Sequence, residues 1–204
     1  MRSKAMGVKS NNENQPILTM KKLVFLISAV LVLVSQLSAQ TLPQITKLIV
    51  LLKADDLSTT GLLNTWSDAS GNGHDATQDS SGLQPTVVLN ALNGKPVVRF
   101  DGVNEFMSTG TGAFISSQPN TVFIIGKTNN LGSGDEPFIA GTNTSNRHNV
   151  LVRNGLYRIF AGTGQNGGAA TTNFALITAL LNAPTGSSLW INQSQRLNNF
   201  NAGS

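Results

Sequence analysis

Oxygen-bearing side chains occupy alternate positions in one short, turn-rich stretch of the chain. Asp68, Ser70 and Asn72 precede a glycine, and Asp79 stands at the twelfth position counted from Asp68. Calcium loops use alternate ligands and a sharp glycine turn to wrap hard oxygens around one cation, although they usually end on a glutamate. The stretch therefore predicts a calcium site with Asp68, Asn72 and Asp75 as ligands. The alternative is a set of Asx turns without an ion, because Asp, Asn and Ser form such turns readily.

A tryptophan late in the chain is a candidate for stacking on a sugar. Strand alternation would point Leu189 and Ile191 to one face and the residue after each of them to the other. If the aliphatic pair faces the core, Trp190 stands outward beside an amide, the combination that sugar sites need. Trp190 and Asn192 are therefore candidate ligand-binding residues. The alternative is that Trp190 packs under a neighbouring loop.

Positive charge is concentrated in the last third of the chain. Residues 137–204 contain four arginines and no acid, a net charge of +4, whereas residues 40–136 contain five Lys/Arg and nine Asp/Glu, a net charge of −4. Arginine recognises carboxylate and sulfate groups with its planar fork of donors, so Arg153 and Arg158 are candidate ligands for uronate or sulfated glycans. The alternative is that the arginines lie on different faces and pair with acids from residues 40–136. The four arginines are Arg147, Arg153, Arg158 and Arg196.

The residues that catalysis would need are scarce. The chain has no cysteine, which excludes disulfides, thiolate zinc sites and a cysteine nucleophile. Glycoside hydrolysis usually takes two carboxylates that flank the scissile bond, but the only glutamates of residues 40–204 are Glu105 and Glu136, which lack a suitable spacing. We expect Asp135 and Glu136 to be solvated in a Gly/Ser/Pro loop. No catalytic residue is predicted.

Two further patterns are expected to be structural. Residues 162–167 match GxGxxG, but no acid follows Glu136 to bind a ribose, so the match predicts a glycine-rich hairpin or loop rather than a dinucleotide site. His148, Arg153 and Tyr157 lie near one another across a predicted turn, and we expect each to support the fold.

Residues 20–39 have the order of a secretory signal peptide. Two lysines precede a run over residues 23–34 that is apolar except for Ser28, and the small Ala39 ends the segment. The run is twelve residues long, whereas a membrane-spanning helix needs about 20. We expect cleavage before Gln40, with no membrane span left afterwards. Residues 1–19 are expected to result from a start codon assigned too far upstream, or to be an extended n-region of the signal peptide.

Removal of this leader changes the charge balance. Residues 1–39 carry the whole net charge of +4, and residues 40–204 contain nine basic and nine acidic side chains. Nucleic-acid binding needs a basic patch on the folded domain, so no nucleic-acid partner is predicted. We expect a secreted protein with a linker over residues 40–46.

Short apolar runs separated by Gly, Pro, Asn or Asp fill the mature chain, a pattern typical of an all-β sandwich or barrel. An Asn-Gly pair at positions 154 and 155 predicts a hairpin. Residues 174–181 also fit helical spacing, but the β context favours a strand. The runs cover residues 48–52, 87–89, 97–100, 122–125, 138–140, 150–152, 156–160, 174–181 and 189–191.

Two motifs resemble a known family. WSDASGNGHDAT at residues 66–77 and ALNGKPVVRFDG at residues 91–102 are similar to the concanavalin A-like lectin/glucanase superfamily, in its laminin G-like branch of bacterial secreted proteins. LLKAD at residues 51–55 and SLWIN at residues 188–192 resemble that branch too. The resemblance implies a two-sheet antiparallel jelly-roll sandwich over residues 47–204.

Members of this family usually continue through further strands after the one that SLWIN resembles. The resemblance therefore implies a truncated jelly roll and a longer polypeptide beyond Ser204. It also implies an extracellular binding module for glycans or cell-surface proteins. The alternatives are a polysaccharide hydrolase or lyase, or a targeting appendage of one, and a structural spacer in a surface adhesin.

Overall fold

The computed structural model describes residues 47–110, 118–141, 148–184 and 186–201. The predicted signal peptide, the linker and Arg147 lie outside the described residues. No helix of the described part has the length and apolar character to cross a membrane. The regular structure consists of antiparallel strands and two short 3₁₀ helices, so the predicted all-β class is confirmed.

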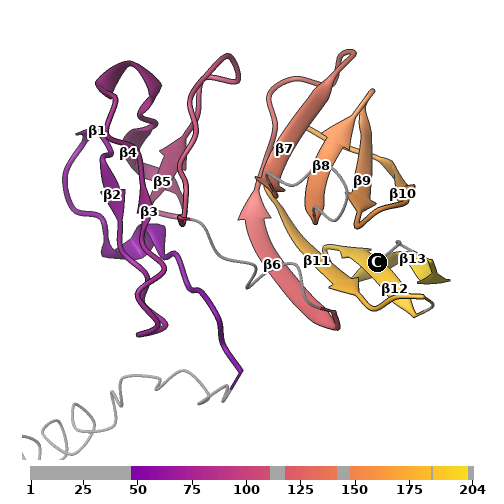
Figure 1. Ribbon diagram of the computed structural model, residues 1–204. Coiled ribbons are helices and arrows are strands. Elements are labelled where there is room, and N and C mark those ends of the chain that lie inside the picture. Colours follow the sequence, from indigo (N-terminus) through magenta and orange to yellow (C-terminus); the bar gives the residue numbers. More distant parts are fainter. Residues whose placement is uncertain (1–46, 111–117, 142–147, 185, 202–204) are drawn as a thin grey trace, which may run out of the picture. The chain divides into compact units, whose positions relative to one another are not determined.

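The first region, residues 48–110, contains a three-stranded sheet and a two-stranded ribbon (Figure 1). In the sheet β4 lies between β1 and β5, and in the ribbon β2 pairs with β3. The turn between β4 and β5 is Asn93-Gly94, whose φ angles of 50° and 76° suit this residue pair in a tight hairpin. The elements are η1 (Ala54–Asp56), β1 (Gly61–Leu62), β2 (Thr65–Trp66), β3 (Ala76–Thr77), η2 (Ser81–Leu83), β4 (Thr86–Leu92) and β5 (Lys95–Arg99).

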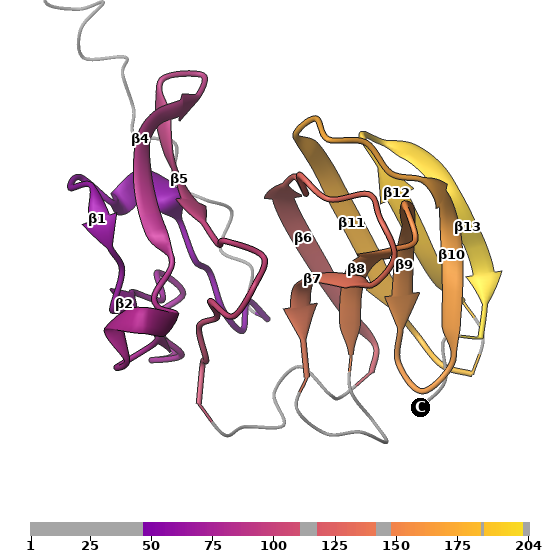
Figure 2. The same cartoon turned by 90° about the horizontal axis from the view of Figure 1, so that it is seen from above.

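The second region, residues 118–201, contains two four-stranded antiparallel sheets. We call them the β7–β10 sheet, with the order β10-β9-β8-β7, and the β6/β11–β13 sheet, with the order β13-β12-β11-β6. The chain makes β6, crosses to the other sheet for β7–β10, and returns with β11 beside β6 (Figures 1 and 2). The strands are β6 (Asn120–Gly126), β7 (Asp135–Ala140), β8 (Asn149–Arg153), β9 (Leu156–Phe160), β10 (Gly164–Ala169), β11 (Ala175–Leu181), β12 (Ser187–Ile191) and β13 (Ser194–Phe200).

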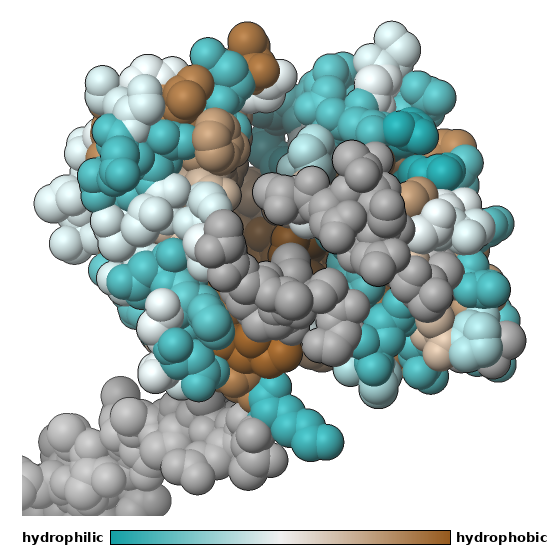
Figure 3. Space-filling view, in the orientation of Figure 1, coloured by the Kyte–Doolittle hydropathy of each residue, from teal (hydrophilic) through white to brown (hydrophobic). Residues whose placement is uncertain are grey.

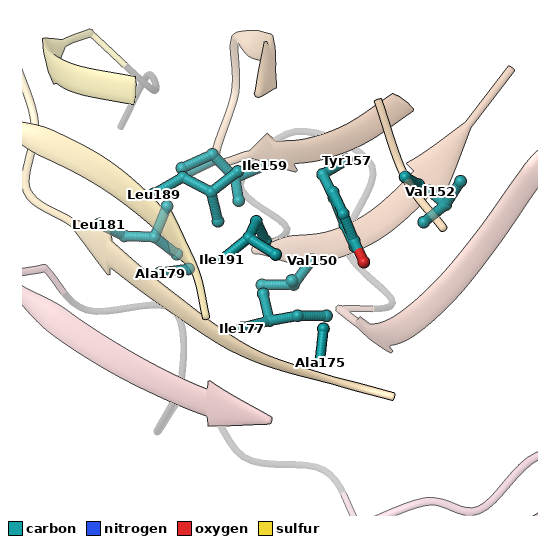
Figure 4. Packing of buried hydrophobic residues seen from close by; sticks show 12 residues of the cluster. Val150, Val152, Tyr157, Ile159, Ala175, Ile177, Ala179, Leu181, Leu189 and Ile191 are labelled. Atoms are coloured by element: carbon teal, nitrogen blue, oxygen red, sulfur yellow. The ribbon is translucent and has the colours of Figure 1, made fainter. Parts of the chain in front are cut away.

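One hydrophobic core lies between these two sheets, as in a β-sandwich. Val150 and Ile159 point into it from the β7–β10 sheet, and Ile177, Leu181 and Leu189 enter from the other sheet (Figure 4). All five side chains are at most 2% exposed. Full burial of such a side chain contributes about 1.5–3 kcal/mol, so this core is the main source of stability in the region.

Turn chemistry and side-chain alternation set the local geometry as predicted. Asn154 and Gly155 have φ angles of 51° and 71° and join β8 to β9 in a hairpin. The ambiguous residues 174–181 are confirmed as mostly strand, because β11 spans Ala175–Leu181. Residues 162–167 enter β10 from a turn, and no helix follows them in the described part.

The predicted loop at Asp135 and Glu136 is wrong, because both residues belong to β7. The turn signals before them end at Gly134, and pairing with β8 extends the strand to Asp135. Pro137 is tolerated inside this strand because β7 is an edge strand, where a missing N–H need not cost an interstrand hydrogen bond.

Candidate functional site

The outer face of the β7–β10 sheet carries two arginines. Val152 on β8 and Ile159 on β9 point into the core, so alternation turns Arg153 and Arg158 to the opposite, outer face. Arg153 pairs with Leu156 across the hairpin, and Arg158 stands opposite Leu151. The two predicted arginines therefore share one face of neighbouring strands.

Arg153 is held by an acid of the neighbouring strand. Its Nε and Nη2 groups donate to the two carboxylate oxygens of Asp135, which lies opposite it in register. These hydrogen bonds and the negative charge of Asp135 raise the pKa of the Arg153 guanidinium. The pairing follows the alternative in which an arginine is matched by an acid from residues 40–136, so Asp135 neutralises the charge of Arg153 and occupies two of its five N–H donors.

Arg158 is fixed by neutral groups. Its Nη1 donates to Asn166 Oδ1 at 2.8 Å. The guanidinium also lies over Gly164, where a Cβ atom would approach its Cζ to 2.6 Å. Among the described residues no carboxylate makes an ion pair with Arg158. We call Asp135, Arg153, Arg158 and Asn166 the arginine face.

Trp190 and Asn192 lie elsewhere. Leu189 and Ile191 are buried as predicted, at 0% and 5% exposure, and Trp190 stands opposite Thr178 on the outer face of the β6/β11–β13 sheet. Trp190 is half-buried there. The sandwich core separates this indole from the arginine face, so the four predicted ligand residues do not form one site.

Asn192 has a structural task. It stands in the turn between β12 and β13 with a φ of 49°. Its Oδ1 accepts a hydrogen bond from the Leu176 N–H at 2.9 Å, and its own N–H donates to the Leu176 carbonyl at 2.9 Å. This side-chain oxygen closes the turn onto β11, so it does not extend beside Trp190 toward a ligand.

The Asp68 turn is a dense hydrogen-bond network. Asp68 Oδ1 accepts from the N–H groups of Leu51 (2.8 Å) and Ser70 (2.9 Å). Its Oδ2 accepts from Ser70 Oγ (2.7 Å) and from the His74 N–H (3.0 Å). Partial burial favours the neutral acid, but these hydrogen bonds outweigh it and lower the pKa of Asp68 to about 2.

The three predicted calcium ligands are all engaged in hydrogen bonds within the chain. Asp75 Oδ1 accepts from the Asp68 N–H at 2.7 Å, and Asn72 directs its Nδ2 group to the carbonyls of Leu48 and Ile49 at 2.8 and 2.9 Å. No group of three or more His, Cys, Asp or Glu suited to a metal occurs among the described residues. Calcium binding stays a prediction, and this geometry favours the ion-free Asx turn.

The residues His148, Arg153 and Tyr157 are not brought together for chemistry. The Tyr157 ring belongs to the core, and Arg153 points to the outer face. His148 is buried and its Nδ1 lies 3.0 Å from Asn120 Nδ2.

Sequence reasoning missed two members of the arginine face. Asp135 was assigned to a loop, and Asn166 was noticed only as part of a glycine motif. A usable signal was present for Asn166, because a strand after the turn at residues 162–163 places Gly164 and Asn166 on the same face. Comparison of the chain with protein-family models, curated proteins and solved structures finds no significant match.

Proposed function

We propose that the protein is a secreted binding module of the laminin G-like, jelly-roll kind, and that it recognises anionic glycans through the arginine face. The observation that carries the proposal is the setting of Arg158. Its guanidinium is held by Asn166 and Gly164, and no described carboxylate neutralises it. A cation fixed in this way is pre-organised for an anion from outside the chain.

The chemistry of the guanidinium selects the ligand class. Arginine has five N–H donors, and one of those in Arg158 is used by Asn166. The planar fork can then take a carboxylate or a sulfate group in two parallel hydrogen bonds. A neutral sugar hydroxyl gains less from the same donors, because it carries no charge. Uronate and sulfated polymers should therefore bind better than neutral ones.

Affinity electrophoresis tests the proposal with a polyuronate, a sulfated polysaccharide and a neutral glucan in the gel. Arg158→Gln should weaken retention by the anionic polymers about tenfold, a loss of about 1.4 kcal/mol. Lys53→Gln is the control, because Lys53 lies in the first region, where it pairs with Asp56, and the net charge changes equally.

Salt provides a second arm of this experiment. Retention that depends on charge must fall as ionic strength shortens the reach of each charge. Equal retention by neutral and anionic polymers, or equal losses in the Arg158 and Lys53 variants, would show that the arginine face is not the binding site.

A further inference from the structure

The outer face of the β6/β11–β13 sheet is apolar, although it faces solvent. Phe123 and Ile125 on β6 are each 69% exposed. In register beside them stand Leu176 and Thr178 of β11, and Trp190 of β12 stands beside Thr178. The space-filling view shows hydrophobic atoms, in brown, at the surface among hydrophilic ones (Figure 3).

Both faces of these strands are therefore apolar. Val122 and Ile124 pack against the core from the inner side of β6, while Phe123 and Ile125 point outward. With apolar side chains on both faces, β6 presents no charge that would discourage another strand from pairing at its edge.

The exposed edge of β6 differs from the other sheet edges. Edge strands usually carry charges, prolines, bulges or short lengths that discourage pairing with another chain. β5 contains Lys95, Pro96 and Arg99, β7 contains Pro137 and a register shift, β10 and β13 contain register shifts, and β1 has two residues. β6 has seven residues, no charge and no proline, and it pairs with β11 at every position without a shift.

We propose that a second copy of the chain binds at this edge, so that β6 pairs with β6 in antiparallel register about a two-fold axis at Phe123. In this register Asn120 meets Gly126 of the second copy, Thr121 meets Ile125, Val122 meets Ile124, and Phe123 meets itself. All seven residues of β6 are then paired. Each outward side chain meets an outward side chain, because opposed residues of an antiparallel pair share a face.

The charges on the chain favour this partner. β6, β11 and β12 contain no charged residue, so no like charges oppose each other on the joined face. Lys127, directly after β6, would stand opposite Pro119 rather than opposite itself. Residues 40–204 carry nine basic and nine acidic side chains, and copies with a net charge near zero repel each other weakly. Pairing merges the two sheets into one and covers, in each copy, the edge of β6 that no described strand occupies.

A single engineered cysteine tests both the contact and its register. The chain has no cysteine, so Phe123→Cys introduces the only thiol. Opposed residues in an antiparallel pair have Cα atoms about 4.5–5.5 Å apart, within the reach of about 7 Å that a disulfide allows. Ile125→Cys is the matched control with equal exposure. Its copies would be four residues out of register, about 14 Å apart.

The variants are expressed from the full sequence given and purified with or without the predicted signal peptide, as the host processes it. They are then oxidised and separated without reductant. Phe123→Cys should form a covalent dimer, and Ile125→Cys should form little disulfide although its copies still associate. Sedimentation of the unmodified protein should show a dimer that Phe123→Lys converts to monomer, since two ammonium groups would then oppose each other. Mixing Phe123→Lys with Phe123→Glu should restore a dimer.

Equal cross-linking of the two cysteine variants would show random collision and overturn the proposal. A monomer with β6 amides protected from hydrogen exchange would also overturn it, because another segment would then cover the edge. The arginine face lies on the opposite side of the sandwich core, so retention by anionic glycans is independent of these outcomes.

Discussion

The two regions of the molecule are held together by different interactions. In residues 48–110 side chains that accept or donate hydrogen bonds tie distant backbone segments, as Asp68 does for Leu51 and His74. Even buried positions there include glutamines, and Gln84 Nε2 donates to the Gln78 carbonyl at 2.7 Å. In residues 118–201 the two sheets share an apolar core instead.

This difference has a physical consequence. Hydrogen bonds to a carboxylate are directional and need the charged form of the acid, so they depend on pH. Apolar burial is non-directional and independent of ionisation. The first region should therefore respond to acid and to single polar substitutions, while the second should respond mainly to changes in core volume.

The largest effect is expected from a core truncation. Ile177 is 1% exposed, and Ile177→Ala should lower the free energy of unfolding by about 2–5 kcal/mol through lost burial and the remaining cavity. Denaturant unfolding followed by Trp190 fluorescence in a Trp66→Phe background measures this loss. Val103→Ala is the control, because that side chain is 85% exposed and its truncation should change stability by less than about 0.5 kcal/mol. Equal losses would contradict the location of the core.

A smaller effect is expected when Asp68 loses its charge. The pKa of Asp68 in the folded protein is about 2, below its ordinary value of 3.8. The charged form therefore stabilises the fold at pH values above about 4, and this stabilisation is lost as the pH falls toward 2. Asp68→Asn should destabilise residues 48–110 by about 1 kcal/mol at neutral pH, a modest value because water reaches the turn.

The two tryptophans distinguish the regions in this test. The chain contains only Trp66, in β2, and Trp190, in β12. In a Trp190→Phe background the fluorescence of Trp66 should report a loss of stability between pH 4 and 2 that Asp68→Asn reduces. In a Trp66→Phe background that substitution should change the pH response little. Identical responses from both probes would mean that the regions do not differ in their dependence on acid.

Local signals allowed much of the second region to be predicted. An Asn-Gly pair fixes a hairpin because both residues tolerate positive φ angles, and Asn154-Gly155 behaves accordingly. Alternation placed Leu189 and Ile191 inside because a strand that packs on one side must bury every second residue. The all-β class followed from the same short-range patterns.

Interactions between distant residues could not be predicted. Asp135 lies 18 positions before Arg153, and only the pairing of β7 with β8 brings them together. The sequence predicted that Asn192 binds a ligand. Its side chain instead closes the turn by accepting a hydrogen bond from β11, 16 positions earlier in the chain, and the local sequence does not show this contact. The exposed apolar face was missed as well, since a strand that is apolar on both sides reads as fully buried.

The smallest expected effect concerns the glycine beneath Arg158. Gly164 has a φ angle that other residues also adopt, but a Cβ atom there would approach Arg158 Cζ to 2.6 Å. Gly164→Ala should therefore push the guanidinium off its place beside Asn166, at little cost in stability because the end of an arginine side chain is flexible. Retention by anionic polymers should weaken about twofold to threefold, well below the loss caused by Arg158→Gln.

Gly82→Ala is the control for this change, since a Cβ atom at Gly82 would have no neighbour within 4 Å. Affinity electrophoresis and thermal unfolding of the two variants, measured together, separate ligand binding from stability. The expected result is reduced retention for Gly164→Ala alone, with both unfolding temperatures close to that of the unmodified protein. Unchanged retention would show that the position of Arg158 is set by the polymer when it binds, so that the arginine face is not organised in advance for an anion.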